Sequence, residues 1–286
     1  MNAIEIIQLT KRFDTFALKD VSFTLEQGTV MGFVGENGAG KSTTIKCILN
    51  LLKKDAGNIF IFGKNHRKDE TAWKEEIGVV FDDIYFPTMM TAKQIDRFLA
   101  KVYKNWDTTY FFHLLERFKV PDNKKIEKLS RGMKMKLSIA AALAHHPKLL
   151  ILDEPTSGLD PIVRDEILDL FLDFMQQDDH SILFSSHITS DLEKIADTIT
   201  FIHEGQILFS DNKDTLLFDY GIWQGTEVEA LELPEQAIVA RRPHAFGLEV
   251  LVKRADVNIA FELNKPSIED LMLFFVKGEK YASTTN

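Results

Sequence analysis

The most constraining feature of the sequence is an apolar run, VMGFV at positions 30–34, followed at once by GENGAGKS at 35–42. A continuous apolar run of this length predicts a buried parallel strand. The glycine–lysine–serine pattern after it predicts a turn whose backbone N–H groups surround phosphate. It also predicts a helix whose positive end faces the same anion. The chain must therefore place strand, phosphate-binding loop and helix in that order.

The loop predicts a set of nucleotide contacts. Lys41 is expected to reach the terminal phosphates, and Ser42 is expected to offer its hydroxyl to Mg²⁺. The other predicted contacts lie in the same turn and at the start of its helix: Gly35, Asn37, Gly38, Ala39, Gly40 and Thr43. A glycine turn with an unrelated lysine is the alternative interpretation, which the strand-then-helix context disfavours.

Two further strand ends carry polar side chains. In LLILDEP, Asp153 ends an apolar run, where a buried carboxylate needs a counter-charge such as Mg²⁺. Glu154 projects differently and is predicted to orient a water against a terminal phosphate. His187 follows the apolar run SILFSS, at a strand end where ligands bind in open parallel sheets. It is predicted to donate to phosphate oxygens. The alternative is a solvated acidic pair and a solvated histidine.

The segment LSRGMKMKL at 129–137 contains a second serine–glycine pattern at a helix start. Ser130 is expected to cap this helix, and Gly132 is expected to let the backbone approach an anion. One terminal phosphate is not easily reached by both this segment and the glycine loop of the same chain. Two chains arranged head to tail solve the problem, because each can offer Ser130 and Gly132 to its partner's nucleotide.

Strands and helices alternate along residues 1–220, which predicts a mostly parallel, doubly wound α/β sheet. Strands are expected at 4–9, 21–25, 58–63, 77–81, 148–153, 181–186 and 199–209, and helices at 161–176 and 190–196. Apolar spacing of three and four residues predicts a helical insert at about 82–147, with helices over 90–106 and 107–118 and another from Ser130.

Residues 221–286 predict a small accessory region. VNIAFEL at 257–263 alternates strictly, as a half-buried strand does. Pro266 and Ser267 predict the start of a helix, and Gly278 predicts its end. A helical tail that only covers the sheet is the alternative interpretation.

The composition indicates which kinds of molecule the chain can bind. A net charge of −9 disfavours nucleic acid as a partner. No stretch reaches the roughly 18 apolar residues of a membrane helix, and the N-terminus lacks the pattern of a secretion signal. Work at a membrane would therefore go through another protein. The single cysteine, Cys47, excludes a disulfide within the chain and is expected to be a packed, inert thiol.

Taken together, these segments resemble the ATP-binding subunit of an ABC transporter over about residues 1–220. The matching segments, in family order, are GENGAGKS (35–42), LSRGM (129–133), LLILDE (149–154), SGLD (157–160) and FSSH (184–187). The resemblance implies a P-loop NTPase fold with an antiparallel β subdomain, a helical subdomain and a small α+β C-terminal appendix. It also implies that the chain binds ATP and Mg²⁺, that Phe13 stacks on adenine, and that Asp160 couples two sites across a dimer.

The resemblance further implies an ATPase at the cytoplasmic face of the cell membrane. An integral membrane subunit would dock on the helical insert, and the second ATPase would be an identical copy or a related chain. Within the family the sequence resembles exporters of the ABC-2 group, including those for phenol-soluble modulins and antimicrobial peptides. A soluble ABC ATPase acting on ribosomes or DNA is the alternative; the single cassette and acidic balance disfavour it. The presence of Glu154 and His187 disfavours a non-catalytic regulator.

Two segments depart from the family pattern. Arg131 and Met133 replace the glycine and glutamine of the usual LSGGQ. Asp82 stands where a glutamine usually contacts Mg²⁺ and the attacking water. An aspartate can still ligate Mg²⁺, but its charge near the terminal phosphate is expected to slow turnover.

Overall fold

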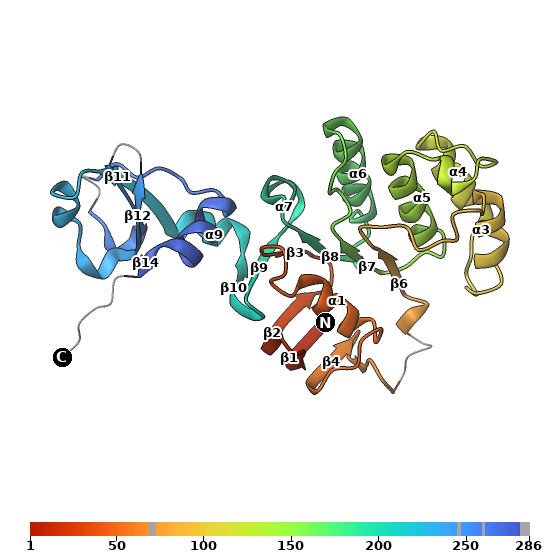
Figure 1. Ribbon diagram of the computed structural model, residues 1–286, viewed down its shortest axis with the longest axis horizontal. Coiled ribbons are helices and arrows are strands. Elements are labelled where there is room, and N and C mark those ends of the chain that lie inside the picture. Colours follow the sequence, from red (N-terminus) through yellow and green to blue (C-terminus); the bar gives the residue numbers. More distant parts are fainter. Residues whose placement is uncertain (69–72, 245–246, 259–260, 281–286) are drawn as a thin grey trace.

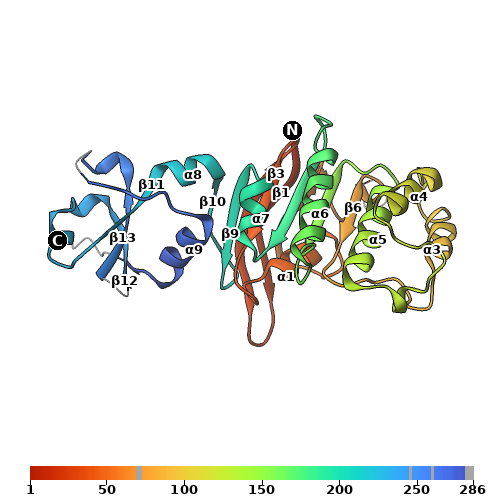
Figure 2. The same ribbon diagram turned by 90° about the horizontal axis from the view of Figure 1, so that it is seen from above.

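The computed structural model describes residues 1–68, 73–244, 247–258 and 261–280. A six-stranded sheet lies at the centre of the described part, with helices to one side of it and a separate sheet to the other (Figure 1). The N-terminal antiparallel sheet covers one face of the central sheet. The view from above shows the helices of residues 92–143 at the opposite end from the C-terminal strands of residues 220–253 (Figure 2).

The central sheet has the strand order β10-β9-β3-β8-β7-β6. Its strands are β3 (Val30–Val34), β6 (Ile77–Val80), β7 (Leu149–Asp153), β8 (Ser181–Ser186), β9 (Thr198–His203) and β10 (Gln206–Asn212). All neighbours are parallel except β10, which pairs antiparallel with β9 at the edge. The predicted parallel α/β sheet is confirmed. The single strand predicted over 199–209 is wrong, because the chain reverses at Glu204–Gly205 and forms two strands.

The N-terminal sheet has the strand order β2-β1-β4-β5 and is antiparallel. Its strands are β1 (Asn2–Arg12), β2 (Ala17–Glu26), β4 (Ala56–Ile61) and β5 (Lys64–Asn65). Helix α1 (Lys41–Ile48) packs with this sheet and one face of the central sheet in a single hydrophobic core. Cys47 lies in this core, where burial raises the pKa of its thiol to about 11. The expected packed thiol is confirmed, and its inertness stays a prediction that the raised pKa supports.

Helices pack against the other face and the β6 edge of the central sheet and share one hydrophobic core with it (Figure 1). They are α3 (Ala92–Leu99), α4 (Thr108–Arg117), α5 (Arg131–Leu143), α6 (Pro161–Phe174) and α7 (Thr189–Ile195), with a short 3₁₀ turn at Ile126–Lys128. Strand β7 shows why the apolar runs are continuous: Leu150 and Leu152 enter this core, while Leu149 and Ile151 enter the core around α1. A strand buried on both faces has no polar side.

The helix predicted over 90–106 is too long, since α3 ends at Leu99. The reason is local hydrogen bonding. Asp96 accepts hydrogen bonds from the Trp106 indole at 2.9 Å and from the Thr108 hydroxyl at 2.8 Å. These contacts require the chain after α3 to fold back against it before α4 begins.

The C-terminal part forms its own antiparallel sheet, in the order β11-β13-β12-β14. One side of it forms a separate hydrophobic core, while Leu251 and Phe274 belong to the core that the helices share with the central sheet. Its elements are α8 (Lys213–Asp219), β11 (Tyr220–Gly225), β12 (Ile238–His244), β13 (Gly247–Lys253), α9 (Ile268–Lys277) and β14 (Glu279–Lys280), with 3₁₀ turns at Glu229–Glu232, Glu235–Ala237 and Arg254–Asp256. The predicted helix is confirmed, and Ser267 caps it. The predicted strand at 257–263 is wrong for its described residues, which form a bend and loop; 259–260 lie outside the described part.

Candidate nucleotide site

Three neighbouring strands end together at one edge of the central sheet. Strand β8 lies between β3 and β7, with Val34 opposite Ser186 and Asp153 opposite Ser185. The glycine loop, Glu154 and His187 therefore leave the sheet side by side. The carboxyl edge of an open parallel sheet is where ligands bind.

Lys41 is held inside the glycine loop. Its side chain is 5% exposed, and Nζ donates to the carbonyl oxygens of Gly35 at 2.7 Å and Glu36 at 3.2 Å. Helix α1 starts here with no side-chain cap and no acidic residue in its first turn, where Thr43 is half-buried. Its uncapped N–H groups and the buried ammonium make the loop a site for an anion.

Glu154 connects Lys41 to His187. One carboxylate oxygen, Oε2, accepts from His187 Nδ1 at 2.6 Å and from the His187 backbone N–H at 3.3 Å. The other oxygen, Oε1, lies 3.4 Å from Lys41 Nζ. Glu154 has φ of 54°, a left-handed conformation that is strained for a non-glycine residue. The backbone thus turns this side chain out of the strand line and toward the loop.

Asp153 lies beside this cluster and is 3% exposed. Its Oδ1 has no hydrogen-bond partner among the described residues. Burial raises the pKa of its carboxyl, while the Ser42 hydroxyl opposes the rise and the Asp82 charge adds to it. A buried carboxylate oxygen without a partner, next to a serine hydroxyl, matches the oxygen donors that Mg²⁺ prefers.

The residues present would supply part of the coordination shell of a Mg²⁺ ion. No cluster of three acidic, histidine or cysteine groups that could hold a metal occurs in the described ranges. Mg²⁺ typically takes one or two protein ligands together with phosphate oxygens and water. Ser42 and Asp153 meet that requirement. Asp82 is exposed and acts on Asp153 through its charge.

A cavity of about 730 Å³ adjoins the glycine loop on the side of the N-terminal sheet. Its lining includes Phe13, Phe16, Asn37, Gly38, Ala39 and His203. Phe13 is 46% exposed, and its ring centroid lies 6.4 Å from that of Phe16. The sequence prediction named Phe13 and missed Phe16, although a second phenylalanine three positions further on was a visible signal.

The LSRGM segment (129–133) lies elsewhere. Ser130 is exposed, and its Oγ accepts a hydrogen bond from the Met133 N–H at 3.3 Å, so the predicted cap is confirmed. Neither Ser130 nor Gly132 lines the cavity that Phe13 shares with the glycine loop. Arg131 instead lines a polar cavity of about 400 Å³ together with Asp82. The two departures from the family pattern are therefore neighbours.

The SGLD segment (157–160) lies against LSRGM. A Cβ on Gly158 would lie 2.8 Å from Nη1 of Arg131. Asp160 is exposed and caps α6, where Oδ1 accepts from the Val163 N–H at 3.1 Å. Ser130 and Asp160 thus belong to one surface of the chain.

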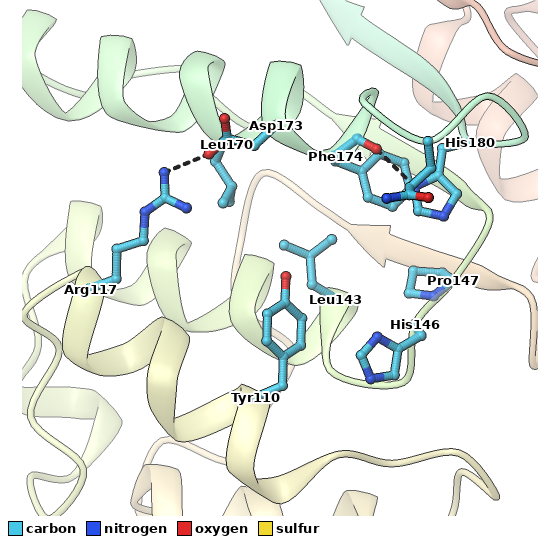
Figure 3. A pocket seen from close by; sticks show the side chains of 10 residues that line it. Tyr110, Arg117, Leu143, His146, Pro147, Leu170, Asp173, Phe174 and His180 are labelled. Carbon is cyan, nitrogen blue, oxygen red and sulfur yellow. Dashed lines mark hydrogen bonds and ion pairs between the residues drawn. The ribbon is translucent and has the colours of Figure 1, made fainter.

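A different cavity, of about 470 Å³, lies among α4, α5 and α6 (Figure 3). Tyr110, His146, Phe174 and His180 line it, and an ion pair of 2.7 Å joins Arg117 to Asp173 at its rim. His146 and His180 precede β7 and β8, so this cavity lies at the amino ends of the strands. None of the predicted nucleotide contacts lines it.

Comparison with known proteins identifies the family of the chain. Residues 18–157 match the family model described as ABC transporter. The ATP-binding protein YtrB of Bacillus subtilis is 34% identical over 76% of this chain and 74% of its own length. The bacitracin transport ATP-binding protein BcrA of Bacillus licheniformis is 38% identical over 72% of this chain and 68% of its own length.

Among solved structures, an ATP-binding subunit of an ABC transporter superposes with a TM-score of 0.68 at 26% identity. The match covers 75% of this chain and 91% of that one. Its fold is the fold described above. The convergent strand ends, the glycine loop and these relatives lead to one conclusion: the chain belongs to the ABC transporter family as an ATP-binding subunit, and it is an ATPase.

Proposed function

We propose that two such ATPase chains enclose ATP between them and drive a separate membrane subunit that exports a peptide or an amphipathic toxic compound. The observation that carries the proposal is the division of the site. Lys41, Glu154 and His187 meet in one cluster within the chain. Ser130 and Gly132 line no part of the adjoining cavity and remain available to a second chain.

The chain's own half of the site has an assigned place for each part of the nucleotide. Adenine lies on Phe13, and the phosphates lie on the loop residues 35–43. On binding, Lys41 exchanges its contacts with loop carbonyls and Glu154 for the terminal phosphates. Because these contacts already hold the ammonium at the loop, little reorganisation is needed.

Ser42 and Asp153 are the proposed Mg²⁺ ligands, with Asp82 as a further oxygen donor. A bound Mg²⁺ ion would neutralise part of the negative charge of the phosphates. Asp153 contributes the buried, unpartnered oxygen at this position. Asp82 brings an additional negative charge close to it, and we propose that this charge slows turnover relative to a glutamine.

Glu154 is the proposed base that orients the attacking water. Once Lys41 turns to phosphate, Oε1 of Glu154 loses its ion pair and becomes free to accept from a water. His187 stays bound to Oε2 through Nδ1 and steadies the carboxylate. A hydrogen bond from His187 Nε2 to a phosphate oxygen then requires a proton on both ring nitrogens.

The second chain supplies Ser130 and Gly132 to the terminal phosphate, and Asp160 couples the two sites. Each charge-assisted hydrogen bond to that phosphate contributes roughly 1.5–3 kcal/mol. Hydrolysis removes the shared phosphate and lets the chains separate. The partner is an identical chain or a related ABC ATPase.

An apolar groove supports the proposed membrane partner. The groove, of about 520 Å³, is lined by Leu51, Trp73, Val79, Phe81, Val102 and Tyr103. Leu51 and Val102 are 64% and 52% exposed, at the junction between the central sheet and the helical part. None of the helices described here combines the length and apolar character needed to cross a membrane. We propose that a short apolar segment of the membrane subunit fills this groove, at the cytoplasmic face of the membrane.

The cargo class rests on relatives and not on the site. BcrA is described as a bacitracin transport protein, and its similarity spans 72% of this chain. We therefore propose export of an antimicrobial peptide or a similar amphipathic compound. The chain can be purified from membranes in detergent, and the integral membrane protein that accompanies it identified. The cargo of that partner can then be assayed.

Replacing Glu154 with glutamine tests the function. Glu154→Gln removes the base while keeping a side chain of the same shape. We expect ATP hydrolysis to fall about a hundredfold or more, and ATP to hold the variant as a dimer in size-exclusion chromatography with light scattering. Glu116→Gln, an exposed change on α4, is the matched control and should behave like the parent. Parental turnover by Glu154→Gln, or a nucleotide-loaded variant that stays monomeric with no sister chain needed, contradicts the proposal.

A further inference from the structure

Helix α7 begins two residues after His187 and is held against α6 by one arginine. The two helices lie side by side (Figure 1). Arg164 of α6 donates from Nε to Asp191 Oδ1 at 2.5 Å and from Nη2 to Ser190 Oγ at 2.6 Å. The first residues of α7 are therefore tied to α6 by a two-pronged contact.

The ion pair at this contact is buried on one side. Asp191 is 1% exposed, whereas the side chain of Arg164 is 28% exposed. The second oxygen of Asp191, Oδ2, has no partner in the described part of the chain. Arg164 is thus the cation that compensates a buried carboxylate, and its loss would leave that charge unpaired.

Arg164 also belongs to the first turn of α6, which Asp160 caps. The Arg164 backbone N–H donates to the Asp160 carbonyl at 3.0 Å. One guanidinium therefore links the turn that carries Asp160 to the turn that carries His187. Both turns belong to the proposed site, yet Arg164 itself lines none of the cavities beside the glycine loop.

We propose that Arg164 is a positioning residue for ATP hydrolysis: it fixes α7, and with it the His187–Glu154 hydrogen bond, relative to the Asp160 turn. This inference rests on the proposed function. When a second chain contacts Asp160, the guanidinium carries any displacement of that turn to α7. A second chain that moves the Asp160 turn would therefore move His187 as well.

A second link between the same helices provides an internal control. Lys194 of α7 contacts Asp165 at 2.7 Å and Asp169 at 2.9 Å on α6. The side chains of Lys194, Asp165 and Asp169 are 35%, 67% and 57% exposed, respectively, so water screens both ion pairs. They join the helices at the surface, further from His187.

The test compares four variants by kcat and KM for ATP, by ATP affinity of the monomer, and by Tm. Arg164→Met should lower kcat tenfold or more while monomer affinity changes less than twofold. Arg164→Lys keeps the charge but loses the two-pronged geometry, and it should recover part of kcat. Lys194→Met should keep kcat within twofold of the parent.

The decisive variant is Arg164→Met combined with Asp191→Leu, since an apolar pair replaces a buried ion pair with little loss of stability. We expect its Tm to return to near the parental value while kcat stays low. Parental kcat in this double variant overturns the inference, because the pair would then serve stability alone. Equal losses of kcat in Arg164→Met and Lys194→Met overturn it too.

Glu154→Gln in the same assays separates this inference from the proposed function. If Glu154→Gln is inactive and Arg164→Met hydrolyses ATP at the parental rate, only the role of Arg164 is wrong. If Glu154→Gln hydrolyses ATP at the parental rate, the proposed base is wrong whatever Arg164 does.

Discussion

The chain contains two helix starts built from glycine and a polar residue, and they differ in what surrounds them. The start of α1 is enclosed: Gly40 is buried with φ of 117°, Lys41 is 5% exposed, and no side chain caps the helix. The start of α5 is open: Ser130 is exposed and caps its own helix, and Gly132 is half-buried.

This difference supports the proposed division of the nucleotide site between two chains. The α1 start has its lysine, its acidic neighbours and its histidine in place before any nucleotide arrives. The α5 start lacks this Lys41–Glu154–His187 cluster: the exposed Ser130 caps its own helix, and Arg131 shares a polar cavity with Asp82. An enclosed half depends on the fold, whereas a projecting half depends on a second molecule, so substitutions in the two should fail in different ways.

The largest expected effect is at Gly40. A Cβ there would lie 2.6 Å from Leu18 Cδ2 and 3.0 Å from Phe16 Cζ, in a backbone conformation that strains other residues. Gly40→Ala should destabilise the fold by about 3 kcal/mol and abolish ATP binding. Chemical denaturation and nucleotide titration measure the two effects.

Gly132→Ala is the matched change in the open half. A Cβ there would lie 3.4 Å from Val163 Cγ1, an ordinary contact, and Gly132 is inside a helix. Alanine should leave stability equal or higher by about 0.5–1 kcal/mol, with ATP binding by the monomer retained and ATP-dependent dimerisation weakened. Similar losses of stability in both variants would remove the distinction between an enclosed and an open half.

A smaller effect is expected at Ser130. Ser130→Ala removes a helix cap, which costs about 1 kcal/mol of stability, and removes one hydrogen bond to the phosphate held by the other chain. Dimerisation in ATP should weaken roughly tenfold or more, while the monomer binds ATP as before. Analytical ultracentrifugation of an otherwise hydrolysis-dead protein measures the change.

Ser267→Ala provides the control for lost capping. Ser267 caps α9 in the C-terminal part with the same kind of hydrogen bond, to the Asp270 N–H at 3.0 Å. It should cost similar stability and leave dimerisation unchanged. If both serine variants weaken the dimer equally, Ser130 acts through its helix alone. If Ser130→Ala abolishes ATP binding by the monomer, LSRGM serves the nucleotide of its own chain.

Local patterns were enough to predict the enclosed half. The strand ends at Val34, Asp153 and Ser186 were visible as apolar runs, and neighbouring parallel strands bring their ends together. The roles of the individual residues stay predictions, since geometry shows where Glu154 and His187 lie and not what they do. Phe16 was not predicted, because the family resemblance implies one aromatic side chain at adenine and Phe13 matches that position.

Contacts between distant segments were not visible in the sequence. Arg164 and Asp191 are 27 positions apart, and nothing in either segment indicates the other. The neighbouring positions of Asp82 and Arg131 likewise depend on how α5 packs beside β6. In the C-terminal part, alternation at 257–263 predicted a strand, but its described residues form a bend and loop. Ile222 bridges to Asn264 just beyond them, and β11 pairs with β13 along its other edge.

The last expected effect is on stability alone and concerns a buried carboxylate oxygen, Oδ1 of Asp153, which has no hydrogen-bond partner among the described residues. Burial raises the pKa of Asp153 in the folded chain above its unfolded value of 3.8. The folded state therefore binds this proton more tightly than the unfolded state. The stability of the parent falls as pH rises from about 4 through the raised pKa, and above that pKa it no longer changes through this group. Asp153→Asn lacks this loss. Without nucleotide, it should be more stable than the parent at pH 7 by about 1–2 kcal/mol, with the advantage disappearing toward pH 4, as thermal unfolding across that range measures. A variant less stable than the parent at pH 7 would mean that the chain itself satisfies this carboxylate, and that the enclosed half is complete without a cation.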